Sequence, residues 1–158
     1  MKMSMRFIGI FVLLLSTVTL MSSCKKDVKY LPGTWRVTSA VINSDFKDDV
    51  KDVWTFNTDG TCKIACDVDE YFDYEDAVID IFEFYGHYVT EGNKILTIES
   101  NKTTFDNADD YSQIRYDLNI HSLNKHTLEV SGTVKEIYVT NGVTTSKVAN
   151  VTLTLTKQ

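Results

Sequence analysis

The chain has 158 residues, of which 43% are hydrophobic and 24% are charged, and its formal net charge is −6. A chain of this length forms a single domain with a sizeable core, so it requires no disulfide framework. The acidic balance and the absence of clustered Lys and Arg disfavour a nucleic-acid partner, because clustered basic side chains are what neutralise phosphates.

The N-terminal segment, residues 1–23, has the composition of a secretory signal peptide. Lys2 and Arg6 are its only charged residues, and an apolar run follows from residue 7 to residue 20. A membrane-spanning helix needs roughly 20 apolar residues, and this run of about 14 is too short. The pattern therefore predicts a signal peptide that is cleaved from the mature protein.

Residues 20–24, Leu-Met-Ser-Ser-Cys, resemble the lipobox of bacterial lipoproteins, with Met21 in place of the usual Leu. The resemblance implies that Cys24 becomes the first mature residue and carries several acyl chains. One chain alone binds marginally, at about 0.8 kcal/mol per buried CH₂, so several make the attachment lasting. The alternative is an ordinary secretory signal followed by a coincidental cysteine, which would leave an odd thiol in a secreted chain.

Under the lipoprotein interpretation, residues 24–30 are a lipidated tether and residues 31–158 form the folded domain. Removal of Lys2 and Arg6 leaves 14 of the 16 basic residues against 22 acidic ones, a net charge of −8. The implied location is the cell envelope, anchored by membrane lipid at Cys24. The outer membrane is favoured, and the periplasmic or surface face stays open.

The mature chain shows period-two patterns separated by turn signals, which predict antiparallel strands. Asp59-Gly60 and Asn141-Gly142 are expected at reversals, because these residues tolerate positive φ. A slip in the pattern near Lys135 predicts a β-bulge that turns Ile137 inward. The predicted strands cover residues 33–43, 52–56, 61–66, 82–90, 94–99, 111–123, 127–139 and a last strand that ends at residue 156, with a polar loop over 100–110.

About eight strands joined mostly by short turns form an antiparallel meander. Closing such a sheet into a barrel removes its exposed edges. The predicted fold is therefore all-β, an eight-stranded antiparallel up-and-down barrel. The interior of such a barrel is just wide enough for packed side chains or one small ligand.

Gly33 and Trp35 stand at the entry of the first strand in Leu-x-Gly-Thr-Trp, which resembles the lipocalin signature. The hairpins at 54–61 and 88–96 are similar to those of lipocalin-like domains on bacterial cell-envelope lipoproteins. Together these motifs cover most of residues 31–156. The resemblance implies a lipocalin-like barrel with an apolar-ligand cavity. It also implies a Trp that closes one end beside an arginine of the last strand, where this chain offers only Lys147 and Lys157.

The cavity for a small apolar ligand would be lined by the large inward-facing residues of the barrel. The same residues would equally form an ordinary packed core. The candidate ligand-binding residues are Trp35, Trp54, Phe56, Ile64, Phe84, Tyr116, Leu118 and Leu153. No cofactor or metal is expected.

The sequence contains no constellation typical of catalysis. His87, His121 and His126 fall in separate strands or turns, with no acidic partner at metal-binding spacing and no nucleophile motif, so they are expected on the surface and no enzyme is predicted. Cys62 and Cys66 lie about 13 Å apart on one strand face. A disulfide needs Cα atoms within about 7 Å, so both are interpreted as small core residues.

Residues 67–83 contain eight acidic residues and no Lys or Arg. The segment does not match a calcium loop, because Phe72 occupies the position that requires Gly. It is interpreted as a solvated excursion between strands.

Two functions follow. The first is a non-catalytic, membrane-anchored binding module for a small apolar ligand. The alternative is a cell-envelope interaction or structural protein that binds a protein or glycan through its loops around a solid core, with exposed aromatic residues at 71–74.

Overall fold

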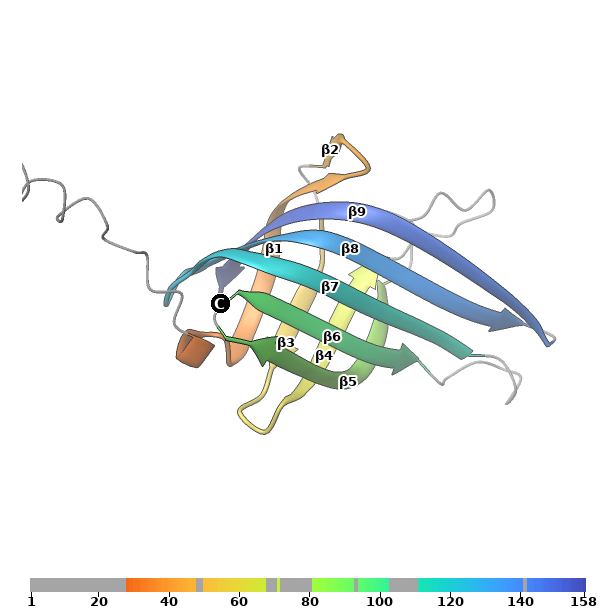
Figure 1. Ribbon diagram of the computed structural model, residues 1–158, viewed down its shortest axis with the longest axis horizontal. Helices are drawn as coiled ribbons and strands as arrows, with labels where there is room; N and C mark the ends of the chain where they lie inside the picture. Colours follow the sequence, from red (N-terminus) through yellow and green to blue (C-terminus); the bar gives the residue numbers. More distant parts are fainter. Residues whose placement is uncertain are drawn as a thin grey trace, which may run out of the picture.

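The computed structural model describes residues 28–47, 50–67, 71, 81–92, 94–102, 111–140 and 142–158. The predicted signal peptide and Cys24 lie outside this part. The strands run in the order β2-β1-β3-β4-β5-β6-β7-β8-β9, and an additional pairing of β1 with β9 closes the sheet (Figure 1). No helix in the described ranges is long and apolar enough to cross a membrane.

The described elements begin with one short 3-10 helix, η1, and continue with strands alone. Their bounds are η1 Val28–Tyr30, β1 Gly33–Ile42, β2 Asp45–Lys47, β3 Val53–Phe56, β4 Thr61–Asp67, β5 Ile81–Glu91, β6 Ile95–Lys102, β7 Tyr111–Leu123, β8 Thr127–Thr140 and β9 Val143–Lys157. Strand β2 pairs only with the end of β1. The other eight described strands form the barrel, which confirms the predicted fold.

Strand placement agrees with the period-two patterns, and two local expectations are wrong. Ser100 belongs to β6 and is buried, so the polar loop begins later than expected. The slip near Lys135 does not occur, since the ladder between β8 and β9 keeps its register throughout. The register shifts instead in the pairing of β7 with β8, between Ile120 and Ser122. Alternation continues as far as Glu136, which faces inward and is only 4% exposed, and Val139 farther along the strand is buried as well.

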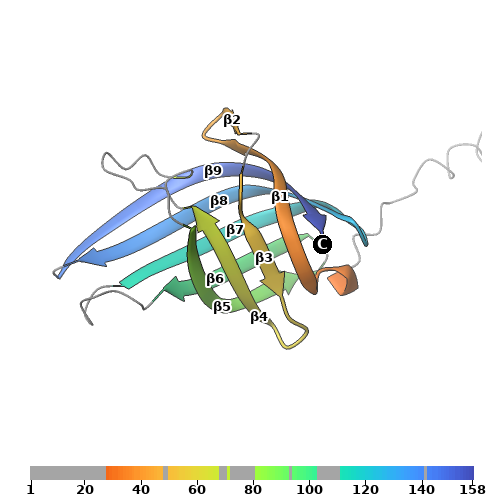
Figure 2. The same cartoon turned by 180° about the vertical axis from the view of Figure 1, so that it is seen from behind.

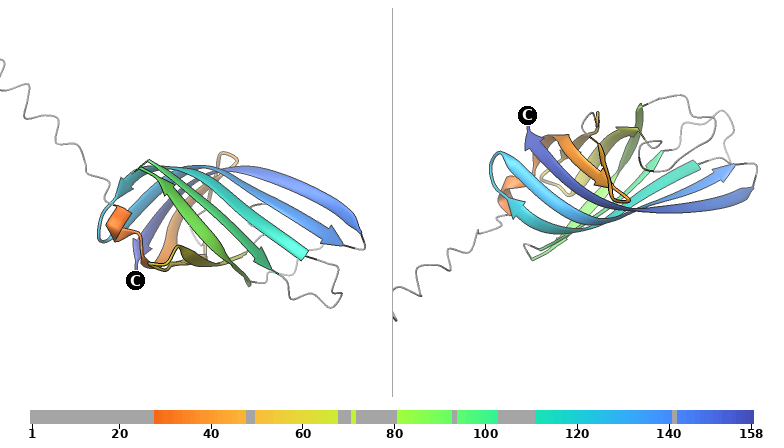
Figure 3. Two further views of the ribbon diagram at one scale, coloured as in Figure 1. Left: turned by 60° about the horizontal axis from the view of Figure 1, so that its bottom comes forward. Right: turned by 90° about the horizontal axis from the view of Figure 1, so that it is seen from above.

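The barrel has two unlike ends, which are visible in all views (Figures 2 and 3). The capped end holds η1, the start of β1 and the end of β9. At the opposite, far end, β1 and β4 end at Ile42 and Asp67, and β5, β7 and β9 begin at Ile81, Tyr111 and Val143. β1 covers β9 only from Val151 to Lys157, so β7, β8 and β9 extend past β1 at the far end.

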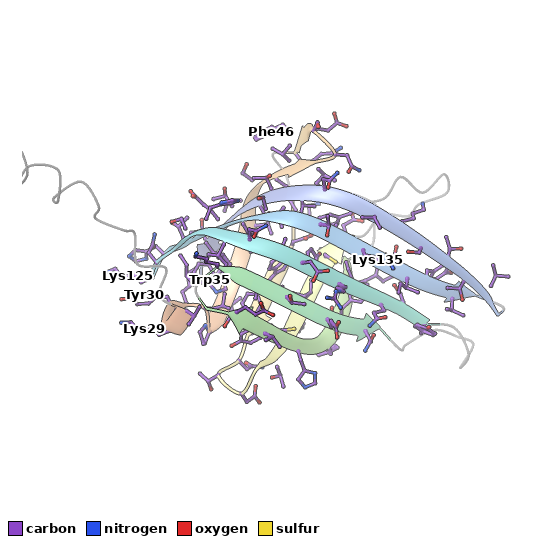
Figure 4. All side chains as sticks on the ribbon, viewed as in Figure 1. Lys29, Tyr30, Trp35, Phe46, Lys125 and Lys135 are labelled. Atoms are coloured by element: carbon purple, nitrogen blue, oxygen red, sulfur yellow. The ribbon has the colours of Figure 1, made fainter. Side chains whose placement is uncertain are left out.

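The cap is built around Trp35, which is fully buried (Figure 4). Its Nε1 donates a hydrogen bond of 2.7 Å to the Leu31 carbonyl oxygen. Lys157 Nζ lies 5.0 Å from the centroid of the Trp35 ring and donates to the carbonyl oxygens of Tyr30 at 2.7 Å and Pro32 at 2.6 Å. Lys157 thus provides the last-strand cation that the resemblance implied, in place of an arginine.

Gly33 is required by the same cap. Its φ is +132°, a conformation that other residues rarely adopt, and an added Cβ would lie 2.5 Å from Lys157 Cε. Any side chain at this position would push the lysine off Trp35. The Gly-x-Trp motif therefore reflects the packing of Gly33, Trp35 and Lys157, which come together only in the folded chain.

Replacing Lys157 with Met tests the cap. The variant keeps most of the apolar stem and loses the charge, both hydrogen bonds and the cation–π contact. We expect the free energy of unfolding to fall by about 2 kcal/mol. Urea denaturation measures the change, and Lys135→Met on the exposed wall is the control, with an expected change of less than about 0.5 kcal/mol. Equal effects of the two substitutions would contradict the capping role.

Candidate functional site in the barrel interior

The eight predicted lining residues all lie inside the barrel, each at most 1% exposed. Trp35 belongs to the cap, and the others lie on β3, β4, β5, β7 and β9, with Phe56 paired to Gly33 at the capped end of β3. Their burial is confirmed. Their contact with a ligand stays a prediction, because the same burial is required of a packed core.

The middle of the barrel is crossed by aromatic rings. Trp54 on β3 and Tyr116 on β7 come from opposite sides, with three strands between them in either direction around the barrel. Their ring centroids are nevertheless only 4.8 Å apart. Phe56 packs edge-on against Trp54, and Tyr71 packs edge-on against Tyr116, each at 6.2 Å. These rings fill the barrel at its mid-height.

Two polar groups in this aromatic layer lack a well-aligned hydrogen-bond partner. Within the described residues, neither Trp54 Nε1 nor Tyr116 Oη makes a hydrogen bond of ordinary geometry, although both atoms are fully buried. The Tyr71 hydroxyl and the Cys66 thiol interact with Tyr116 Oη without such geometry, so Trp54 Nε1 is the more completely unsatisfied of the two. An unsatisfied buried donor costs about 1–3 kcal/mol. The other tryptophan, Trp35, is equally buried and does have its partner. The centre of the barrel therefore presents two adjacent donors that need an acceptor.

Toward the far end the interior becomes acidic, with Asp52, Asp67 and Glu136 buried. Asp52 accepts hydrogen bonds from the Tyr71 hydroxyl and, at 3.4 Å, from the Asp67 backbone N–H. Glu136 accepts one from Ser112 Oγ at 2.8 Å and lies opposite Lys147 in the β8–β9 ladder. These hydrogen bonds offset part of the free-energy cost of burying carboxylates.

The sequence interpretation missed these acids, although their spacing contained the signal. Asp52 stands two residues before Trp54, and Glu136 stands two residues after Val134, so each continues an inward-facing row. Asp67 is also buried, which corrects its assignment to a solvated segment. Tyr71 is 2% exposed, so it does not provide the exposed aromatic side chain that would favour the alternative function. Residues 68–70 and 72–80 of the acidic segment lie outside the described part.

Burial keeps the hydroxyl and thiol groups of this region neutral. It raises the pKa of Tyr116 well above its usual value, and the nearby Cys66 and Asp52 raise it further. Burial and Asp52 likewise raise the pKa of Tyr71 and of Cys66. Tyr116 therefore remains a hydrogen-bond donor across the physiological pH range.

The remaining candidate residues lie as expected. Cys62 and Cys66 are free, buried thiols on β4, and burial raises the pKa of Cys62 to about 11. The three histidines are exposed. In the described ranges, no three His, Cys, Asp or Glu side chains are grouped so that they could hold a metal ion.

The two tyrosines of the aromatic layer form a matched pair for mutation. Tyr71→Phe removes the hydroxyl that donates to buried Asp52, so we expect the free energy of unfolding to fall by about 2 kcal/mol. Tyr116→Phe removes a hydroxyl that has no described partner of ordinary hydrogen-bond geometry and should leave stability within about 0.5 kcal/mol of wild type, or raise it. Urea denaturation of both variants measures the difference. A Tyr116→Phe loss as large as that of Tyr71→Phe would show that the Tyr116 hydroxyl is satisfied in the resting protein.

Comparisons with known proteins give this chain neither a family nor a residue role. No protein-family model matches it, and no curated protein matches it. Among solved structures, the chain is similar to a lipocalin-like protein from Bacteroides uniformis ATCC 8492, with 13% identity, a TM-score of 0.45, and coverage of 82% of this chain and 99% of that chain. At this identity no residue role is transferred, and the site rests on the geometry of this chain.

Proposed function

We propose that this chain is a non-catalytic, membrane-anchored lipoprotein whose barrel binds one small, mostly apolar ligand through an uncharged hydrogen-bond acceptor. The observation that supports this most directly is the pair of buried donors, Trp54 Nε1 and Tyr116 Oη, which lack an acceptor of ordinary geometry among the described residues and lie in contacting aromatic rings inside the barrel. A ligand carbonyl, ether or hydroxyl oxygen would accept from one or both. The surrounding aromatic and aliphatic side chains would contact its apolar body.

The charges of the interior argue against an anionic ligand. Asp52, Asp67 and Glu136 are buried beside the donors, while none of the buried residues in the described ranges is Lys, Arg or His. Lys147 is half-buried and lies opposite Glu136, which offsets one of the three acids. A carboxylate or phosphate would have to enter this interior without a counter-charge, which is costly in a medium of low dielectric constant.

A specific observation favours the alternative, an interaction or structural protein with a solid core. The 4.8 Å contact between Trp54 and Tyr116 occupies the middle of the barrel, so a ligand there must displace or separate the two rings. In a solid core, one buried water could accept from both donors. The two proposals therefore differ in whether these rings move when small molecules are offered.

Fluorescence titration can decide between them, because the chain has only two tryptophans. In a Trp35→Phe variant, Trp54 alone reports. The probes are a methyl ketone, an alcohol, an amine and a carboxylate of one chain length. We expect the ketone and the alcohol to change the Trp54 emission when they bind. The affinity for the carboxylate should be at least about tenfold lower than that for the ketone, and the Tyr116→Phe substitution should lower the affinity for the ketone about tenfold. Absence of any binding, together with no small molecule extracted from the purified protein, would favour the solid core.

The anchor is tested separately, since its support is the sequence at 20–24. Replacing Cys24 with Ala removes the sulfur required for a thioether, so labelled palmitate should enter the wild type and not the variant. Cys62→Ala is the matched control and should keep the label, because Cys62 is buried in β4. Equal labelling of wild type and Cys24→Ala would exclude lipidation at this residue.

A further inference from the structure

We infer that the capped end of the barrel rests on an anionic membrane surface, with the far end directed away from the bilayer. The inference depends on the proposed acylation of Cys24. It concerns a property that acylation alone does not decide, namely which face of the domain contacts lipid headgroups.

The length of the tether limits where the membrane can be. Cys24 and Val28 are separated by four residue steps, which span at most about 14 Å. Strand β9 contains 15 residues and is therefore roughly 46 Å long. An anchor attached through η1 cannot hold the far end on the membrane with the capped end directed away from it, because the far end lies about three times farther from η1 than the tether reaches. Two orientations therefore remain, end-on contact through the capped end and a barrel that lies flat.

The attachment point is fixed to the barrel. The Leu31 N–H donates to the Val28 carbonyl oxygen at 3.0 Å, which closes the turn of η1. Lys157 Nζ, at the end of β9, donates to the carbonyl oxygens of Tyr30 and Pro32. η1 is thereby held against the capped end and cannot swing along the wall.

The capped end carries groups that suit anionic headgroups. Lys29 and Lys125 are exposed there on either side of Tyr30, and Lys29 Nζ lies 5.0 Å from the Tyr30 ring (Figure 4). Each lysine near an anionic surface strengthens binding to it by roughly fivefold. The tether sequence adds Lys25 and Lys26 against one acid. Asp59 and Glu91 lie on other turns of this end and offset two of these charges, whereas the exposed Lys94 on the turn between β5 and β6 adds one, so lysines still outnumber acids there.

The far end and the wall lack this excess of positive charge. The acidic segment leaves β4 at Asp67 and returns to β5 at Ile81, so both of its junctions with the barrel lie at the far end. On the wall, ion pairs among the described residues match two cations with three acids, which leaves no excess of positive charge. They join Lys63 to Glu83, and Arg115 to Glu99 and Asp117. The charge distribution therefore favours end-on contact over lying flat, and a ligand or partner would reach the far end from the aqueous side.

Depth-dependent quenching tests the orientation on the acylated full-length product. Three variants each carry one added cysteine at an exposed position, labelled with the same fluorophore. They are His126→Cys on the capped end, Lys135→Cys on the wall and Val143→Cys at the far end. Cys62 and Cys66 are buried, and the unsubstituted protein controls for their labelling. The protein is reconstituted into vesicles of phosphatidylethanolamine and phosphatidylglycerol containing a headgroup spin label. We expect several-fold stronger quenching at position 126 than at 135, and none at 143.

Other results have distinct meanings. Quenching at 135 or 143 equal to that at 126 would overturn the orientation while leaving the anchor intact. Mass spectrometry that finds no acyl group on Cys24 would overturn the anchor itself. In the protein labelled at position 126, the double substitution Lys29→Glu with Lys125→Glu should reduce quenching on anionic vesicles. The same double substitution should leave quenching unchanged on phosphatidylcholine vesicles, and Lys135→Glu should change quenching on neither. Unchanged quenching in the double variant would overturn the contact with anionic headgroups.

Discussion

The pairing of β1 with β9 is the constraint on which the rest of this structure depends. It joins the first and last strands of the barrel from Trp35 to Ile42 and leaves neither with an open edge along that length. Closure turns the sheet into a barrel with an enclosed interior. It brings Lys157 over Trp35 at the capped end, and it brings the side chains of strands on opposite walls into contact across the middle.

The interior formed in this way is not uniform. In its capped half, the buried Trp35 indole donates to the Leu31 carbonyl oxygen and is satisfied. The middle of the interior contains two donors that lack an acceptor of ordinary geometry among the described residues, and the far half contains three buried acids. Unsatisfied buried donors are destabilising, so their presence in a small domain suggests a role in binding that offsets their cost. That reasoning supports a neutral acceptor as the polar part of a ligand.

The difference between the two ends connects the interior to the proposed anchor. The cap closes the barrel where the tether begins, and the acidic segment joins it where the long strands project. An anchored barrel with this arrangement would bind its ligand or partner from the aqueous phase and not from the bilayer. The fold alone does not imply this orientation. It follows from the place at which η1 is hydrogen-bonded to the last strand.

The sequence by itself determined most of the strands, the turn at Gly60 and the burial of Cys62 and Cys66, because each depends on a period of two or on a local φ requirement. The tertiary structure decided the rest. Alternation along β8 turns Glu136 inward, but its burial is offset by a hydrogen bond from Ser112 on a neighbouring strand, a partner that no local pattern reveals. Trp54 and Tyr116 meet only because their strands close on opposite sides of one barrel, and Lys157 reaches Trp35 only through the β1–β9 ladder. Local alternation predicts which side chains turn inward, whereas strand register and closure decide which of them meet.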